Sequence, residues 1–287
     1  MLEASSNKEW WQRQADSTAE YYAATFKIGD ELSRFSSLQG CAWFYVWSAF
    51  KLLVTETSPE LSTIILERAI EVATKAIEIE SYEKMYYRMK HYQDENGMVI
   101  IEEDRDFHPS KKEVQIQRLN GTLTCLKSIY YAHILLNKSI DQKLIAKITT
   151  YYNESYALYY AKSFSIEAFE EILYWCLESN NADMAISYYK EYNKSIPIDK
   201  LILKKDYNRN PIYVLYIIAN YLSGKHELGL YVEKGMDYWI RRCNNWYIPG
   251  SIAILPDWIR INWAILYFYI KNETYDVNSI IKLLRGY

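Results

Sequence analysis

Glycine, proline and long apolar runs are all scarce in this chain of 287 residues. Its nine glycines and six prolines exclude collagen-like and linker-like proteins. No uninterrupted apolar run exceeds eight residues, whereas a membrane-spanning helix needs about 20. Basic clusters of five or more residues are absent and the net charge is −3, so the sequence predicts no nucleic-acid partner and no membrane partner. Half of the residues are hydrophobic, which excludes disorder and predicts a globular fold with a substantial core.

Cysteine is also rare, and its spacing excludes two common uses. Cys41, Cys125, Cys176 and Cys243 form no C-x-x-C pair and no zinc pattern. Each lies among apolar residues, so we expect four buried thiols that act as small hydrophobic side chains. No apolar segment typical of a secretory signal follows Met1. A cytoplasmic location is therefore expected.

Apolar residues recur with helical spacing along most of the sequence. Helices are expected over residues 8–26, 30–57, 58–80 and, in a more polar form, 81–92. Ser58 and Pro59 suit the first turn of the third of these helices. Three buried stripes are predicted: Ile65, Ala69, Val72, Ala76 and Ile79; Leu119, Leu123, Leu126, Tyr130 and His133; and Ile145, Ile148, Tyr152, Tyr156 and Tyr159. The fold class is therefore all-α, with about eleven helices packed as antiparallel hairpins, either as a bundle or as a short helical-repeat-like array.

Two segments interrupt the helical pattern. Residues 93–110 contain Gly97 and a β-like run, and are either a long loop or a small β-hairpin near 97–101. Residues 244–256 contain Pro249-Gly250 and allow the same two interpretations. Neither segment has the composition of a flexible linker, so one helical domain, 1–287, is expected. Alternatively, residues 1–92 and 111–287 form two substructures joined by an acidic loop, 93–110.

A repeated pattern occurs in the second half of the chain. Residues 179–186 align with residues 223–230 at an offset of 44, and each segment joins two predicted helices. Ala185 and Gly229 occupy equivalent positions and are small enough to let paired helices approach closely. The offset resembles that of helical-repeat proteins, although ordinary helical hairpins would give the same pattern. We predict that these two hairpins pack side by side.

Catalytic motifs are missing from the sequence. The four histidines form no metal-binding pair, and His133 on an apolar stripe is expected to be a core or boundary residue. The sequence contains no phosphate-binding glycine loop and no nucleophile elbow. Trp246, Trp258 and Trp263 are expected to pack the last long helix against the core, or alternatively to line a pocket. No catalytic, metal or cofactor site is predicted, and no cofactor is expected.

One acidic segment stands out as a candidate partner-binding site. Within thirteen residues it has six carboxylates and one arginine, Arg105. The interpretations are a solvated loop, a divalent-cation site, and an electronegative patch that attracts a basic protein. Contiguous carboxylates do not fit the alternating spacing of a calcium loop. The candidate partner-binding residues are Asp94, Glu95, Glu102, Glu103, Asp104 and Asp106.

The hairpin turns at 179–186 and 223–230, followed by a Trp-rich helix from Asp257, resemble the all-helical immunity proteins of bacterial polymorphic toxin systems. This resemblance covers about the last 120 residues and includes no diagnostic motif. It implies a non-catalytic protein that binds and neutralises a cognate toxin, with an acidic surface facing a basic toxin domain.

Two other classes of function fit the same sequence. A helical small-molecule or lipid-binding protein would have an aromatic-lined pocket, and the 29 tyrosines could supply its walls. A divergent all-helical enzyme would bring titratable side chains together only in three dimensions. We expect the protein-binding function. The sequence does not indicate an oligomeric state.

Overall fold

The structure is a computed structural model that describes residues 31–54, 59–78, 89–93, 99–103, 110–159, 166–192, 196–244 and 257–285. Within these ranges it contains eleven α-helices and one β-hairpin, so the predicted all-α class is confirmed. The chain divides into two compact units. Unit 1 comprises Met1–Leu52 and Thr57–Ile129, and unit 2 comprises Leu53–Glu56 and Tyr130–Tyr287. Two of the boundaries, after Leu52 and after Ile129, fall inside helices, and none falls in the acidic segment 93–110.

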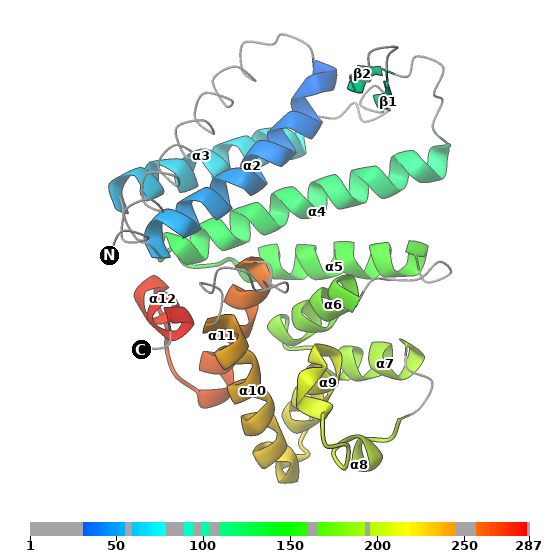
Figure 1. Cartoon of the computed structure of the whole chain (residues 1–287), viewed down its shortest axis with the longest axis vertical. Coiled ribbons are helices and arrows are strands. Elements are labelled where there is room, and N and C mark those ends of the chain that lie inside the picture. Colours follow the sequence, from blue (N-terminus) through cyan, green and yellow to red (C-terminus); the bar gives the residue numbers. More distant parts are fainter. Residues whose placement is uncertain are drawn as a thin grey trace. The chain divides into compact units, whose positions relative to one another are not determined.

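Unit 1 contains helix α3 (Pro59–Glu78) and most of α2 (Glu31–Val54) and α4 (Lys111–Leu135) (Figure 1). Four of the five residues in the predicted α3 stripe are buried, and Ile79 lies outside the described residues. On α2, the apolar run 41–50 is mostly buried, although Phe44 is 47% exposed. The Lys127 ammonium lies 4.9 Å from the centre of the Trp43 ring and links α4 to α2. The predicted helix 8–26 lies outside the described residues.

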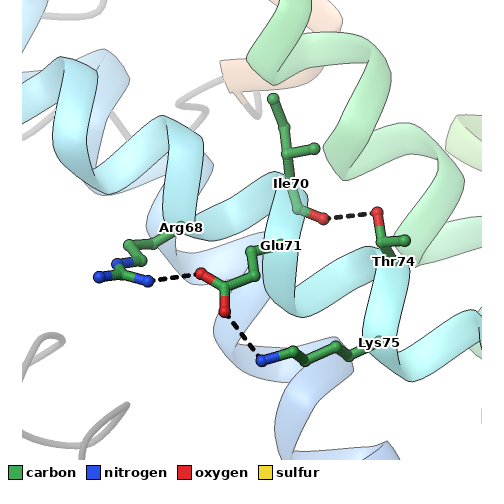
Figure 2. A network of polar contacts seen from close by, with 5 residues as sticks. All are labelled: Arg68, Ile70, Glu71, Thr74 and Lys75. Atoms are coloured by element: carbon green, nitrogen blue, oxygen red, sulfur yellow. Dashed lines mark hydrogen bonds and ion pairs between the residues drawn. The ribbon is translucent and has the colours of Figure 1, made fainter.

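The outer surface of α3 has an exposed ion-pair network (Figure 2). Glu71 accepts a hydrogen bond from Arg68 Nη1 at 2.5 Å and another from Lys75 Nζ at 2.8 Å. These residues are three and four positions from Glu71, so they lie on the same face of the helix. Beside them, Thr74 Oγ1 donates to the Ile70 carbonyl at 2.8 Å.

A small antiparallel β-hairpin interrupts the helices of unit 1. Strand β1 (Met89–Gln93) pairs with β2 (Val99–Glu103), so the alternative of a hairpin near 97–101 is confirmed. The expected helix 81–92 is wrong for residues 89–92, which belong to β1; residues 81–88 lie outside the described residues. Local spacing could not reveal this strand, because its hydrogen-bond partners are on β2.

Unit 2 consists of successive helical hairpins. Helix α6 contacts α5, α7, α9 and α11, and α10 contacts α9, α11 and α12. The predicted stripe on α5 is buried at every position from Ile145 to Tyr156, and the stripe on α4, most of which belongs to unit 1, is buried from Leu119 to Tyr130. The two hairpins predicted from the 44-residue offset do pack side by side, because both α6 and α7 contact α9. The helices are α5 (Gln142–Tyr159), α6 (Ile166–Glu178), α7 (Ala182–Tyr192), α8 (Ile198–Leu201), α9 (Pro211–Leu222), α10 (Gly229–Asn244), α11 (Asp257–Lys271) and α12 (Val277–Arg285).

The same turn follows α4, α6, α9 and α11. A residue with positive φ ends each helix: Asn137, Asn180, Gly224 and Asn272, which are 43, 44 and 48 positions apart. Asn and Gly adopt this left-handed conformation at the least cost, and it closes the helix with a Schellman-type turn. The N–H of each of these residues bonds to the carbonyl three positions back, and the next N–H bonds to the carbonyl five positions back. The turn found in both aligned segments therefore occurs four times in the described residues.

Hydrogen bonds at these turns connect hairpins that are distant in the sequence. The Val277 N–H donates to Asn137 Oδ1 at 2.7 Å, so the last hairpin contacts the first turn. The Tyr269 hydroxyl donates to Asn180 Oδ1 at 2.9 Å, and Ser223 Oγ donates to Asp183 Oδ1 at 2.9 Å. Since α11 also contacts α6, the hairpins of unit 2 close on one another and do not form an open array.

The close approach expected at Gly229 occurs at another glycine. A methyl group added at Gly229 would meet one neighbouring atom, Tyr221 Cε2, at 3.7 Å, an ordinary contact distance. At Gly235 the same methyl group would lie 2.7 Å from Val214 Cγ1. Gly235 therefore permits α10 to pack tightly against α9. The prediction for Gly229 was wrong because the sequence alignment did not give the orientation of α10, although Ala185 is fully buried as expected.

Candidate functional site

The structure places only part of the acidic segment. Glu102 and Glu103 are the last residues of β2, while Asp94, Glu95, Asp104 and Asp106 lie outside the described residues. In the register of the hairpin, Lys90 is directly opposite Glu102 and Met89 is opposite Glu103. The six residues remain a predicted partner-binding segment.

A first candidate site is the polar cluster inside unit 2, where the end of α4 meets α6. The Tyr130 hydroxyl donates to Glu178 Oε1 at 2.8 Å and lies 3.1 Å from the Tyr174 hydroxyl. The Tyr174 hydroxyl donates to Glu178 Oε2 at 3.4 Å. Trp175 is fully buried beside them, with its ring centre 4.7 Å from that of Tyr130.

Burial controls the ionisation of this polar cluster. Desolvation raises the pKa of the Glu178 carboxyl, although the hydrogen bonds from Tyr130 and Tyr174 oppose the shift. Desolvation, reinforced by the Glu178 charge, raises the pKa of both tyrosines well above the ordinary value and that of Tyr275 to about 12. Protonated tyrosines are hydrogen-bond donors and poor bases at neutral pH. The cluster is therefore suited to holding helices together.

Two buried glutamates, Glu170 and Glu171, lie on α6 and face α5 and α11. Trp263 Nε1 donates to Glu170 Oε1 at 2.9 Å, and the Tyr152 hydroxyl donates to Glu171. A cavity of about 10 Å³ lies beside them, with room for about one water molecule. It is too small for a substrate. Its walls are Glu170, Glu171, Tyr174, Leu215, Ile259, Asn262, Trp263 and Leu266.

A second candidate site is a surface groove between α10 and α11, which also reaches the end of α9. Its volume is about 190 Å³, and the floor is apolar while the rim is charged. Lys271 Nζ bonds to Glu233 Oε1 at 3.2 Å and lies 6.0 Å from the centre of the Tyr267 ring. The hydrogen bond that Lys271 donates to Glu233 is the main cause of the raised Lys271 pKa. We call this hollow the α10–α11 groove; it is lined by Tyr221, Gly229, Val232, Glu233, Met236, Asp237, Tyr267, Ile270 and Lys271.

The groove was not predicted from the sequence. Its α10 residues recur at helical spacing and mix apolar with acidic side chains, at positions 229, 232, 233, 236 and 237. That spacing is the signal that could have indicated an amphipathic groove wall. The partner wall on α11 begins 30 residues later, and only the fold brings the two walls together.

The four cysteines and His133 lie in surroundings that are typical of residues with a structural role. All four cysteines are buried thiols with no disulfide between them, as expected. Burial raises the pKa of the Cys125, Cys176 and Cys243 thiols to about 12, which makes them poor nucleophiles at neutral pH. His133 is partly exposed, as a boundary residue, and its buried Nδ1 has no hydrogen-bond partner among the described residues.

The three tryptophans near the second irregular segment have three different outcomes. Trp263 packs in the core as expected, with its ring stacked on Trp239 at 5.1 Å between centres. Trp258 is half-buried at the start of α11. Trp246 and residues 245–256 lie outside the described residues, so the predicted loop or hairpin there stays a prediction.

Neither a metal site nor a membrane span is found in the described part of the chain. No three or more His, Cys, Asp or Glu side chains in those ranges are arranged to hold a metal ion. No described helix is both long and apolar enough to cross a membrane. Comparison of the chain with protein-family models, with curated proteins and with solved structures gave no match.

Proposed function

We propose that this chain is a non-catalytic protein-binding protein, and that it acts as a bacterial immunity protein that neutralises a cognate toxin. The observation that supports binding of a protein is the α10–α11 groove. At about 190 Å³ it is smaller than the roughly 300–1,000 Å³ of small-molecule sites, yet it can receive one large side chain. Its apolar floor and charged rim are typical of protein contacts.

The two alternative functions have less support in the described residues. A small-molecule or lipid-binding protein would need an aromatic-lined interior pocket, but the aromatic interior around Trp175 is filled by packed rings. A divergent enzyme would need a titratable group exposed to a substrate. The buried Glu170 and Glu171 of α6 instead accept hydrogen bonds beside a cavity of about 10 Å³.

The proposed function is tested by toxin neutralisation. The coding sequence next to this chain's own is expressed alone and then together with the chain in a bacterial host. We expect growth inhibition by the first protein, recovery on co-expression, and elution of the two proteins as one complex. A neighbouring product that does not inhibit growth, or inhibition that this chain does not relieve, contradicts the immunity function.

The acidic segment is tested in the same system by association kinetics at two salt concentrations. We expect the variant with Glu102→Gln, Glu103→Gln, Asp104→Asn and Asp106→Asn to associate more slowly at low salt and to depend less on salt. Screening acts beyond about 10 Å at 0.1 M ionic strength, so the difference should shrink as salt rises. Equal rates for the variant and the parent would place the interface elsewhere. A matched control neutralises four exposed carboxylates: Glu60→Gln, Glu154→Gln, Asp199→Asn and Glu273→Gln.

A further inference from the structure

We propose that the α10–α11 groove is the docking site for a segment of the protein partner that inserts one large apolar side chain and places an arginine or lysine beside Asp237. This proposal rests on the proposed function and adds the chemistry of the partner. All walls of the groove belong to unit 2, on helices α9, α10 and α11. The acidic segment 94–106 belongs to unit 1, so the two surfaces can be tested separately.

The floor of the groove explains the apolar part of the partner. Val232 and Met236 are buried on α10, and Ile270 is partly buried on α11. Gly229, at the α9 end, leaves space because it has no side chain. Next to it, Leu230 is 58% exposed and lies one turn before Glu233, so apolar surface continues beyond the rim. An apolar side chain inserted by the partner would cover both the floor of the groove and the exposed surface of Leu230.

The rim explains the cationic part of the partner. Glu233 and Asp237 supply two negative charges and Lys271 supplies one positive charge. The Lys271 ammonium bonds to Glu233, whereas Asp237 has no ion-pair partner within 4.0 Å in the described residues. Lys271 also attracts Asp237 over a longer distance, and the three charges together leave a net charge of −1 next to an apolar floor. A cation flanking the inserted side chain would compensate that charge.

The probes are synthetic peptides and the protein is the full chain. Each nine-residue peptide has a central phenylalanine flanked on each side by two arginines; one comparison peptide replaces the arginines with glutamates, and another replaces the phenylalanine with alanine. We expect the arginine–phenylalanine peptide to bind at least about tenfold more tightly than either comparison peptide, a difference that requires both features of the groove. In the amide NMR spectrum it should shift the signals of Gly229, Val232, Asp237 and Ile270. Equal binding of the three peptides, or shifts confined to other residues, overturns the proposal.

Two variants test the groove directly. Gly229→Leu fills the hollow, and the open surroundings of Gly229 predict that the variant folds with an unchanged melting temperature. It should weaken binding of the arginine–phenylalanine peptide by about tenfold or more. Asp237→Asn should weaken binding severalfold and flatten its dependence on salt, and it remains a valid test if Gly229→Leu does not fold. The matched control is Leu203→Ala, which removes a side chain that is 78% exposed and does not line the groove.

The toxin experiment separates failure of this proposal from failure of the proposed function. If the parent neutralises the toxin and Gly229→Leu, correctly folded, neutralises it equally well, the groove proposal is wrong and the proposed function stands. If the parent does not neutralise the toxin but binds the peptide in the groove, the immunity function is wrong and the docking site stands. Loss of both neutralisation and peptide binding in Gly229→Leu supports the docking site.

Discussion

Two glutamates in this protein each accept hydrogen bonds from two donors, yet their pKa values move in opposite directions. Glu71 lies on the surface of α3 in unit 1, and its pKa is lowered mainly by hydrogen bonds from Lys75 and Arg68 (Figure 2). Glu178 lies in the interior cluster of unit 2, and burial raises its pKa despite the bonds from Tyr130 and Tyr174. The number of hydrogen bonds is equal, so the difference comes from the charge of the donors and from access to water.

The comparison indicates what each region contributes to stability. Surface ion pairs such as that of Glu71 contribute little, because water solvates the separated charges almost as well. A buried polar cluster fixes the positions of its members, since an unsatisfied buried donor costs about 1–3 kcal/mol. We therefore expect substitutions in the interior of unit 2 to have much larger effects than substitutions on the surface of α3.

The largest effect is expected at Trp175, which is fully buried against four tyrosine rings. Trp175→Ala should lower the free energy of unfolding by about 3–5 kcal/mol, because it leaves a cavity that the surrounding helices cannot fill. The control on α3 is Ile64→Ala, at a side chain that is 56% exposed, with an expected change within about 0.5 kcal/mol. Urea denaturation measures both. Similar losses for the two variants would remove the contrast between the regions.

A smaller effect is expected where α10 meets α9. Gly235→Ala places a methyl group 2.7 Å from Val214 Cγ1 and should destabilise the protein by about 1–3 kcal/mol through overpacking. Gly229→Ala, on the same helix, should be neutral or stabilising by up to about 1 kcal/mol, because alanine favours the helix and meets no obstacle. Thermal unfolding of the pair extends the comparison to two glycines. If Gly235→Ala does not destabilise the protein, α10 does not pack tightly against α9 at this position.

The two glutamates can be compared directly by truncation. Glu178→Ala should cost about 1–3 kcal/mol, because the Tyr130 and Tyr174 hydroxyls lose their acceptor. Glu71→Ala should cost no more than about 0.5 kcal/mol, since the side chains of Arg68 and Lys75 are about half exposed and regain water. Chemical denaturation under identical conditions provides the measurement. Equal losses of unfolding free energy in the two variants would show that burial does not determine how much each glutamate contributes to stability.

The smallest effect is the dependence of stability on pH, and its sign should differ between the two sites. A glutamate in an unfolded chain titrates near pH 4.3. The raised pKa of Glu178 means that the folded state binds its proton more tightly, so this contribution to stability falls as pH rises from that value through the folded pKa. For Glu71 the lowered pKa gives a contribution that is present above the unfolded value and is lost as pH falls through the folded pKa.

Melting temperatures between about pH 2.5 and pH 7 measure this difference, because the Glu71 contribution is lost only below the unfolded value. Relative to Glu178→Gln, the parent should lose stability as pH rises. Relative to Glu71→Gln, the parent should lose stability as pH falls. Parallel curves for the parent and Glu178→Gln would show that the cluster does not perturb the glutamate.

The sequence was sufficient for features that depend on neighbouring residues. Apolar spacing predicted α2, α3 and the buried stripes of α4 and α5, because one helix face determines that pattern. The offset of 44 identified two of the four equivalent turns. The turns at Asn137 and Asn272 were missed, because their common feature is a backbone conformation and their flanking residues differ.

Features that depend on distant residues could not be predicted in this way. Tyr130 and Glu178 are 48 positions apart, and Tyr131 donates to Asn262 across 131 positions. Neither pair leaves a local pattern. The α10–α11 groove and the tight contact at Gly235 also require the orientation of helices that only the packed structure supplies.

The hydrogen bond between Asn137 and Val277 has a consequence for the synthesis of the protein. It joins residues 140 positions apart, so the turn after α4 cannot reach its final set of contacts until α12 has left the ribosome. At about 5–20 residues per second, the ribosome needs roughly 7–28 s to add the intervening chain. During that interval the end of α4 is covered only by the hairpins made so far. Unit 2 can therefore complete its folding only after synthesis has reached α12.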